Sequence, residues 1–412
     1  MRSGNELKAF YPTLLLLIVA VLINYADRGN LALAAPVLKT EWNLSGTQLG
    51  VLLSAFFWSY MALQIPVGWL IDRFNVNVIL AFGFLIWSLS TAASGLVAGF
   101  ATMLLMRLLL GVGEAVMFPA TSKICALHLP ERSRGFANAV IMAAIRWGTA
   151  AGTFGGGLLI AHWGWRRTFI VIGLAGLLWL PAWMIWKPQL RAAPQPEKSQ
   201  VPVKFRAIVG LRSFWGAAMG HFCANYLLYF IMSWLPYYLV HERGVSMQFM
   251  AATAGMLYVI DSFSAIATGW IADRRIRSGG DACTVRKWSM AIGFLIAAGG
   301  MMACATATNT SWLPCLAVTA MGSGIAASGS FAVGQTLAGP VLAGRWIGLQ
   351  NCVANIAGVT GPALTGLLVD RTGSFSVAFI LAAAVAVFGA LSWIFGIRRS
   401  PVMEAAPASA GM

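Results

Sequence analysis

The chain has 412 residues, of which 59% are hydrophobic and only 10% are charged, and its formal net charge is +15. A soluble domain carries about 25% charged residues, so this composition excludes an ordinary water-soluble enzyme and indicates a protein whose solvent is lipid. The basic residues gather in alternate loops between apolar runs. This distribution argues against nucleic-acid binding and is typical of the positive-inside pattern of membrane proteins.

Apolar runs long enough to cross a bilayer, about 20 residues each, recur along the whole chain. The first run follows Lys8 and could be mistaken for a signal peptide. However, Asp27 and Arg28 interrupt it and no small-residue cleavage site closes it, so we expect a retained first helix. We predict twelve spans, at 10–36, 46–71, 77–97, 100–126, 134–161, 167–187, 208–240, 247–273, 287–307, 312–338, 345–369 and 375–398.

A basic segment interrupted by prolines separates the sixth span from the seventh and predicts a domain boundary. We expect an N-terminal six-helix bundle at 1–187, a cytoplasmic linker at 188–206, a second six-helix bundle at 207–400 and a short tail at 401–412. The hexapeptide Gly68-Trp-Leu-Ile-Asp-Arg73 returns as Gly269-Trp-Ile-Ala-Asp-Arg274. Such a repeat is expected when two homologous halves need the same helix-to-helix turn at the same membrane face. The distribution of Lys and Arg predicts that both termini face the cytoplasm.

Four further motifs carry a resemblance to a known family. They are Asn24-Tyr-Ala-Asp-Arg28 in span one, Arg107-Leu-Leu-Leu-Gly-Val-Gly-Glu114 with Phe118-Pro119 in span four, Asn225, Tyr229, Trp234, Pro236 and Tyr238 in span seven, and Asn351, Asn355, Gly358 and Pro362 in span eleven. Together with the hexapeptide they resemble the major facilitator superfamily, and more narrowly its anion:cation symporter branch. That branch includes bacterial hexuronate, galactonate and glucarate carriers and the vesicular glutamate and sialic acid carriers of animals.

The resemblance implies the major facilitator fold, an all-α membrane protein with twelve transmembrane helices in two six-helix halves. It further implies proton-coupled transport by alternating access, and we expect a multi-pass protein of the bacterial cytoplasmic (inner) membrane. The chain departs from the superfamily after Asp72 and Arg73, where Asn75, Val76 and Asn77 replace the usual glycine and basic pair. The latch between conformations that this loop implies is therefore expected to be weaker in the first half.

Seven charged residues fall within the apolar stretches of the predicted spans, clear of the terminal residues: Asp27, Arg28, Arg107, Glu114, Lys123, Arg146 and Asp261. A charge at the centre of a bilayer costs at least about 2.5–3.5 kcal/mol, so these residues are expected to face one another or water. Lys123 lies near the cytoplasmic end of its span, where extension toward the lipid headgroups explains it.

Arg107 and Glu114 are two helical turns apart and share one face of span four. Span one runs in the opposite direction, which brings Asp27 and Arg28 to an overlapping depth. If both spans line a central cavity, as the resemblance implies, these two carboxylates and two guanidiniums form one cluster.

Such a cluster predicts proton-coupled symport of a small organic anion, such as a sugar acid or another carboxylate. A carboxylate in a poorly hydrated cavity binds a proton more readily than in water, and an arginine fork binds a carboxylate through two hydrogen bonds. Protonation of Asp27 or Glu114 would therefore release Arg28 or Arg107 to bind the anion. The resemblance implies the same roles. The alternative is a static network of ion pairs that holds the helices together.

Arg146 and Asp261 are not what the resemblance leads us to expect in spans five and eight. Both are predicted near the midplane, on spans that face each other across the two halves in this fold. We predict an ion pair between the halves that forms and breaks as access alternates. The alternative is that Arg146 is an additional substrate clamp, which would favour a dianion.

Polar side chains on otherwise apolar spans are candidate substrate contacts, with hydrogen bonding between helices as the alternative explanation. They are Tyr25, Tyr60, Gln64, Asn225, Tyr229, Ser328, Asn351 and Asn355. At the cytoplasmic helix ends, we assign Asp72 with Arg73, and Asp273 with Arg274, to the latch.

The sequence shows no catalytic constellation, no P-loop and no metal-ligand spacing. We therefore expect neither an enzyme nor a bound cofactor or metal, with protons as the coupling ion, and a monomer, because nothing in the chain demands an oligomer. Two alternatives stay open. An exporter of drugs or metabolites would have a more apolar cavity, and a transporter-like ligand sensor would carry a sizeable soluble domain.

Exchanging the two charges tests the pairing of Arg146 with Asp261. We expect Arg146→Asp and Asp261→Arg each to abolish substrate uptake into proteoliposomes. The double variant should recover a measurable part of the uptake, because it restores the ion pair with reversed polarity. A double variant as inactive as the single ones would contradict the pairing.

Overall fold

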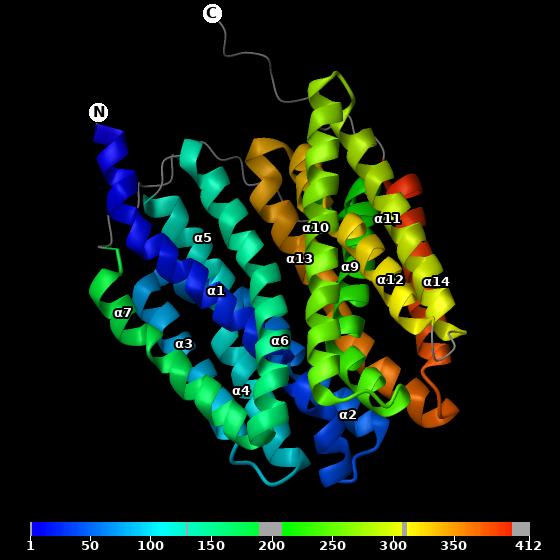
Figure 1. Ribbon diagram of the computed structural model, residues 1–412. Coiled ribbons are helices and arrows are strands. Elements are labelled where there is room, and N and C mark those ends of the chain that lie inside the picture. The colour runs from blue at the N-terminus through cyan, green and yellow to red at the C-terminus, as the bar shows by residue number, and fades with distance from the viewer. Residues whose placement is uncertain (1, 129–130, 189–207, 307–310, 398–412) are drawn as a thin grey trace, which may run out of the picture. The chain divides into compact units, whose positions relative to one another are not determined.

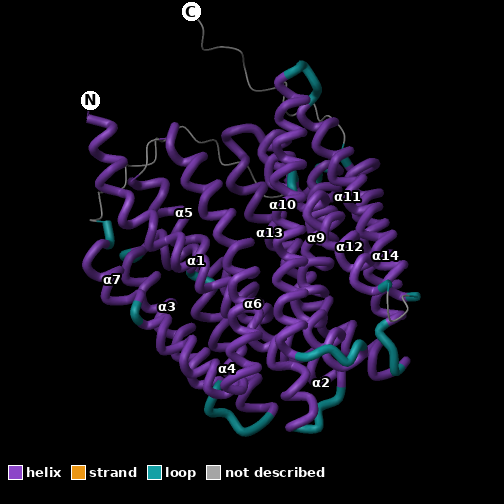
Figure 2. Tube along the Cα trace, viewed as in Figure 1, coloured by secondary structure: helices purple, strands orange, loops and turns teal. Residues whose placement is uncertain are grey.

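The computed structural model describes residues 2–128, 131–188, 208–306 and 311–397. These residues form helices joined by short loops, and no strand occurs among them (Figure 2). The helices of the first part of the chain are α1 (Arg2–Glu41), α2 (Gly46–Arg73), α3 (Val76–Ser94), α4 (Phe100–Glu114), α5 (Met117–His128), α6 (Glu131–Leu177) and α7 (Trp179–Trp186). The later ones are α9 (Arg212–Tyr237), α10 (Met247–Arg277), α11 (Ala282–Ala305), α12 (Trp312–Ala327), α13 (Ser330–Thr372) and α14 (Ser376–Leu391), with π-helical turns η1 (Tyr238–Glu242) and η2 (Ser392–Gly396).

The described helices confirm the all-α membrane fold. Ten helical segments of the described chain are long and apolar enough to cross a membrane. One of them, Ala143–Trp186, runs over both predicted spans five and six. The remaining predicted span corresponds to α9, which is not among these ten segments.

The structure agrees closely with the predicted limits of spans four, ten and eleven, where the candidate spans are Phe100–Cys125, Trp312–Ala338 and Trp346–Thr372. Within the fourth span, α4 ends at Glu114 and α5 begins at Met117. The range α6 takes in two helices that meet at Gly164, whose φ of 77° and ψ of 162° are not helical and suit a residue without a side chain, so spans five and six are separated there. The range α13 likewise takes in spans ten and eleven, and the chain turns back between them, since the Gln350 amide donates to the Ser330 carbonyl at 3.2 Å.

The described chain divides into two compact units. Unit 1 takes in the described residues of 1–200, 232–258 and 362–367, and unit 2 takes in those of 201–231, 259–361 and 368–412. The predicted limits of the two bundles stay a prediction. Almost all of the predicted linker and the whole predicted tail lie outside the described residues, which exclude 189–207 and 398–412.

Within unit 1, helix α6 lies along α1 (Figure 1). Gly148 and Gly152 of α6 meet the backbone of α1 directly, at Leu22 and Ala26, so that a side chain at either glycine would collide with it. Small residues at every fourth position allow two membrane helices to approach this closely. This contact holds the polar segment of α1 in place.

Two tryptophans of α7 hold this helix against α3 and α1 in unit 1. The rings of Phe84 in α3 and Trp179 in α7 stack with centroids 4.2 Å apart, and Trp183 stacks on Trp179 at 5.0 Å. Each indole N–H donates to a backbone carbonyl, Trp179 to Leu16 and Trp183 to Asn77. The rings therefore bury a large apolar area while their polar atoms stay satisfied.

The end of α9 and part of α13 also pack in unit 1. The Trp234 indole donates to the Pro362 carbonyl at 3.1 Å, and the Lys39 ammonium lies 4.9 Å from the centre of the Tyr237 ring. Residues of α9 beyond Ile231 are thereby placed in the same unit as α1, α2 and α4.

In unit 2, close glycine contacts again set the helix packing. Gly293 and Gly300 of α11 lie against the backbone of α12 at Ile325 and Thr319, and Gly216 of α9 lies against Gly396 of η2. Each half of the chain thus uses small residues where its helices approach most closely.

Replacing Gly152 with alanine tests the contact between α6 and α1. The added methyl group would collide with the backbone at Ala26, so we expect a loss of about 1–3 kcal/mol in the free energy of unfolding. Tryptophan fluorescence during thermal unfolding in detergent micelles measures the change. Gly155→Ala is the matched control, because its added carbon would meet nothing within 4 Å. Equal losses in both variants would contradict the close packing.

Candidate functional site

An ion pair lies buried in the middle of unit 1. The Arg28 Nε of α1 donates to Glu114 Oε2 of α4 at 2.8 Å, and the two side chains are 2% and 0% exposed. The predicted overlap in depth between spans one and four is therefore correct. A fully enclosed pair of opposite charges has almost no water to screen it.

Aromatic rings surround the guanidinium of Arg28. Its Cζ lies 4.5 Å from the ring centre of Tyr25, 4.7 Å from that of Tyr60 and 5.0 Å from that of Phe56. Such contacts attract a cation through the negative face of each ring, with about 2 kcal/mol or more for a desolvated pair. Tyr25 and Tyr60 are predicted as substrate contacts. In the structure, their rings stabilise the Arg28 guanidinium.

Gly111 explains how α4 reaches this depth in the unit. It lies between Arg107 and Glu114 in the sequence and meets the Phe56 carbonyl of α2, where any side chain would collide. The Ser59 hydroxyl adds a hydrogen bond of 2.7 Å to the Leu108 carbonyl. Helix α4 is thus held against α2, which brings Arg107 to the Phe56 ring.

The second guanidinium has a different environment. Arg107 is 5% exposed, and its Cζ lies 5.4 Å from the Phe56 ring centre. Among the described residues it makes no hydrogen bond and has no carboxylate oxygen within 4 Å, although Glu114 and Asp27 act on it electrostatically from farther away. A buried guanidinium in this state is a strong site for an anion that can supply the missing hydrogen bonds.

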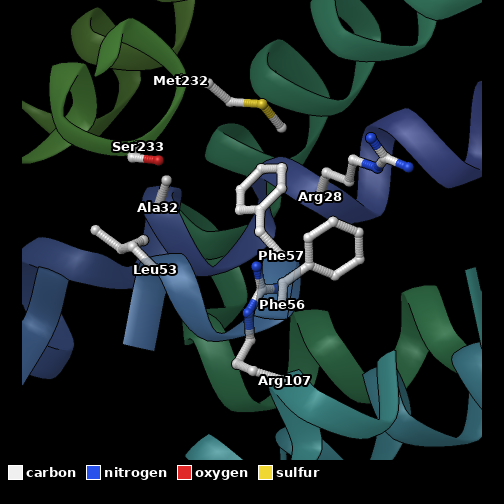
Figure 3. Close-up of a pocket in the computed structure, with 8 residues that line it drawn as sticks. All are labelled: Arg28, Ala32, Leu53, Phe56, Phe57, Arg107, Met232 and Ser233. Atoms are coloured by element: carbon white, nitrogen blue, oxygen red, sulfur yellow. The ribbon is translucent and has the colours of Figure 1, made fainter. Parts of the chain in front are cut away.

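Arg107 lines a pocket that lies wholly within unit 1 (Figure 3). Its other lining residues are Arg28, Ala32, Leu53, Phe56, Phe57, Met232 and Ser233. In this structure the pocket is narrow, with room for a molecule of the size of water and not for a sugar acid. A larger ligand therefore requires side chains of the wall to move.

Asp27 is buried beside this pocket, with 2% of its surface exposed. The Asn30 amide donates to its Oδ1 at 3.1 Å, and Trp87 and Glu114 also lie within electrostatic reach. The structure therefore brings all four predicted charges, Asp27, Arg28, Arg107 and Glu114, into one cluster.

Several functional candidates were not found from the sequence. Phe56 and Phe57 resemble ordinary apolar positions, although Phe56 is one turn before Tyr60 and so shares its face. Ser233 follows Tyr229 by one turn on α9, which could have identified it. No sequence pattern identifies Met232 as a pocket residue, apart from its position next to Ser233.

The predicted polar residues of unit 2 are brought together only in part. The Tyr229 hydroxyl donates to Asn355 Oδ1 at 2.9 Å, and the Asn355 amide donates to the Asn351 carbonyl at 2.8 Å. Asn225 is half-buried on the same helix as Tyr229, one turn before it. Ser328 instead donates to the carbonyl of Ile325 in its own helix, at 2.8 Å.

Three predicted site residues within the spans remain: Gln64, Arg146 and Asp261. Gln64 is half-buried on α2, and its Nε2 has no hydrogen-bond partner in the described part of the chain. Arg146 is half-buried on α6 in unit 1, whereas Asp261 is buried on α10 in unit 2. Their pairing stays a prediction.

The predicted latch residues lie at the ends of α2 and α10. The Asp72 side chain lies outside the described residues, and Arg73 is exposed, with its Cζ 5.3 Å from the Trp69 ring centre. In the second half, Arg274 lies in the same way 5.6 Å from Trp270, and Asp273 accepts a hydrogen bond from Arg286 at 3.2 Å.

Lys123 lies near the end of α2 in the structure, and its predicted extension to the headgroups stays a prediction. Its ammonium donates to the Ile71 carbonyl near the end of α2. A cation at this position offsets the negative end of the helix dipole.

A family model described as Major Facilitator Superfamily matches residues 17–280. The chain is also 30% identical to the hexuronate transporter of Bacillus subtilis (strain 168), over 94% of each chain. The chain belongs to the Major Facilitator Superfamily. A second member of the superfamily, the "Probable galactarate/D-glucarate transporter GarP" of Escherichia coli (strain K12), is 27% identical over 96% of each chain. The predicted family is thereby confirmed, and with it a multi-pass membrane protein.

Solved structures confirm the superfamily fold. A bacterial homologue of the human lysosomal transporter Spinster, in an inward-facing and occupied conformation, matches with a TM-score of 0.79 at 20% identity, over 94% of this chain and 97% of that one. A D-xylose–proton symporter matches with the same TM-score at 14% identity, over 95% and 98%.

Removing one partner of the buried pair should be more harmful than removing both. Glu114→Ala leaves the Arg28 guanidinium buried without its carboxylate, and we expect a loss of about 3–5 kcal/mol in the free energy of unfolding. The double variant Arg28→Met with Glu114→Leu leaves no charge behind and should unfold at a higher temperature than Glu114→Ala. Thermal unfolding in detergent measures both. A double variant that unfolds at a lower temperature than Glu114→Ala would show that a buried unpaired charge is not what destabilises Glu114→Ala.

Proposed function

We propose that the protein is a proton-coupled symporter that imports a small organic anion, a sugar acid or a related carboxylate, by alternating access. The single observation that carries the proposal is the unpaired guanidinium of Arg107, buried beside the ion pair of Arg28 and Glu114. The relatives named as hexuronate and galactarate/D-glucarate transporters support a sugar acid as the cargo.

The charges of the cluster give the order of events. Two guanidiniums and two carboxylates sum to zero when all four are ionised. A proton on Glu114 breaks the ion pair and leaves the cluster with one excess positive charge, which is costly in a site of low polarity. The carboxylate of a substrate restores neutrality, so proton and anion each make the binding of the other more favourable.

The ion pair favours Glu114 over Asp27 as the residue that exchanges the proton. Glu114 bonds Arg28 directly at 2.8 Å, so its protonation releases a guanidinium of the site. Asp27 accepts instead from the neutral amide of Asn30 and keeps its charge as a fixed counterion for the two arginines. Arg107 binds the substrate carboxylate, and the released Arg28 completes the site.

The membrane and the orientation are part of the same proposal. Lys and Arg gather in the loops on the side of both termini, which supports a bacterial inner membrane protein with its termini in the cytoplasm. An inward proton gradient across that membrane then drives the anion inward.

Uptake by purified protein in proteoliposomes tests the coupling. With an inward proton gradient, we expect the wild type to accumulate a radiolabelled sugar acid such as D-glucuronate above its external concentration. Glu114→Gln imitates the protonated carboxyl group, so it should lose this accumulation while it still exchanges internal for external substrate. Gradient-driven accumulation at the wild-type level in Glu114→Gln would show that the coupling role is wrong.

Arg107→Gln in the same assay separates binding from coupling. This variant removes the anion clamp and should lose exchange as well as accumulation, by about 100-fold or more, because a buried carboxylate would be left without its charged partner. Arg371→Gln removes an exposed arginine from the end of α13 and is the control for the loss of one positive charge. Equal activity of the Arg107 and Arg371 variants would contradict the proposed clamp.

A further inference from the structure

The wall of the pocket that faces the arginines is formed by α9. Ser233 is 6% exposed and lines the pocket together with Met232, both within unit 1. Figure 3 shows the Ser233 hydroxyl and the Arg107 guanidinium reaching the pocket from different helices, α9 and α4. The two side chains can therefore bind two different groups of one ligand.

The hydroxyl of Ser233 is available for such a contact. Serines in membrane helices commonly donate to a carbonyl of their own helix, as Ser264 does to Ile260 here at 2.7 Å. Ser233 makes no such bond and no other hydrogen bond within the described part of the chain. A polar group left unsatisfied at a pocket wall gains most from a ligand that carries a matching hydroxyl.

The remaining wall is apolar. Leu53, Phe56 and Phe57 of α2, with Ala32 of α1 and Met232 of α9, offer no hydrogen bond from their side chains. An open-chain sugar diacid carries hydroxyls along its whole length, and each one buried against this wall without a partner costs about 1–3 kcal/mol. A ring sugar instead presents a flat face of C–H groups, which packs against aromatic and aliphatic side chains.

The net charge of the cluster also favours a monoanion over a dianion. In the proposed cycle one proton leaves the cluster with one excess positive charge, and a monoanion cancels it. A dianion would leave a net negative charge in the same enclosed site, which is costly in a medium of low polarity.

On these grounds, which rest on the proposed function, we propose that the pocket selects a ring-form sugar monocarboxylate over an open-chain dicarboxylate, and that Ser233 is a specificity-determining residue. The carboxylate lies on Arg107, one ring hydroxyl donates to or accepts from Ser233, and a C–H face of the ring packs on Phe57 and its neighbours. Met232 is the flexible part of the wall, because its unbranched side chain can change rotamer to widen the pocket.

The first arm of the test uses the wild-type protein in proteoliposomes with an inward proton gradient. Initial rates are measured for D-glucuronate, D-galacturonate, D-gluconate, D-glucarate and D-galactarate. We expect kcat/KM for the two ring monoanions to exceed that for the two diacids by tenfold or more, with D-gluconate between them. Diacids taken up as well as the ring acids would overturn the selectivity but uphold the proposed symport. Failure of the gradient to drive uptake of any of the five would overturn the proposed function itself.

The second arm assigns the hydroxyl with monodeoxy analogues of D-glucuronate. In the wild type, one analogue should lose about three- to tenfold in kcat/KM relative to D-glucuronate, which is the effect of one hydrogen bond. In Ser233→Ala, D-glucuronate should lose the same factor, and that analogue should lose nothing further. If every analogue matches D-glucuronate in the wild type, Ser233 has no such role, and this result stands whether or not the variant folds.

A matched control separates this effect from a general disturbance of packing. Ser54→Ala removes another buried hydroxyl from unit 1, one that donates to Val51 of its own helix and does not line the pocket. We expect its kcat/KM for every sugar acid to stay within twofold of the wild type. Equal losses in Ser54→Ala and Ser233→Ala would contradict a specific contact at Ser233.

Discussion

The buried bond between Arg28 and Glu114 is the interaction on which the rest of the site depends. Neither charge would be tolerated in a lipid-spanning helix alone, and each is stabilised by the other at 2.8 Å, out of contact with water. The pair cannot separate without leaving an uncompensated charge. In the proposed cycle, Arg28 is therefore released only when a proton neutralises Glu114, and this condition ties the anion to the proton.

The two arginines of the cluster perform different tasks because their surroundings differ. Arg28 is fixed three times over, by a carboxylate, by two tyrosine rings and by the Phe56 ring. Arg107 shares only one of these contacts, because its guanidinium lies 5.4 Å from the centre of the same Phe56 ring. No carboxylate of the described structure lies within hydrogen-bonding distance of it. A site that held both guanidiniums equally tightly would have nothing to offer a substrate before the proton arrives.

The sequence predicted which charges meet, because a helix has a fixed rise and alternate spans run in opposite directions. That argument brings the charges of spans one and four to overlapping depths, the family resemblance implies that both spans line one cavity, and the buried pair of Arg28 and Glu114 agrees with both. The sequence could not predict which carboxylate bonds which guanidinium. That choice depends on the rotation of α4 about its axis, which is set where Gly111 meets α2.

Other features depend on contacts that no local pattern reveals. Ser233 and Met232 reach the pocket because the end of α9 packs with helices nearly two hundred residues earlier in the chain. The hydrogen bond from Lys123 to the Ile71 carbonyl is equally hidden from the sequence, because that carbonyl lies on another helix.

The walls of the pocket divide into a rigid side and an adaptable side, and this division suits a site that must fill and empty. Helices α1, α2 and α4 meet the rest of unit 1 through glycines, where a shift of the backbone would cause collisions, so the two arginines keep their geometry. The opposite wall offers the flexible side chain of Met232, which can yield without moving a helix. Rigid cations preserve the preference for a carboxylate, while a soft wall lets a pocket that is narrow in this structure accept and release a ring. The preference for a carboxylate and the capacity of the wall to yield therefore reside on different helices of the same unit.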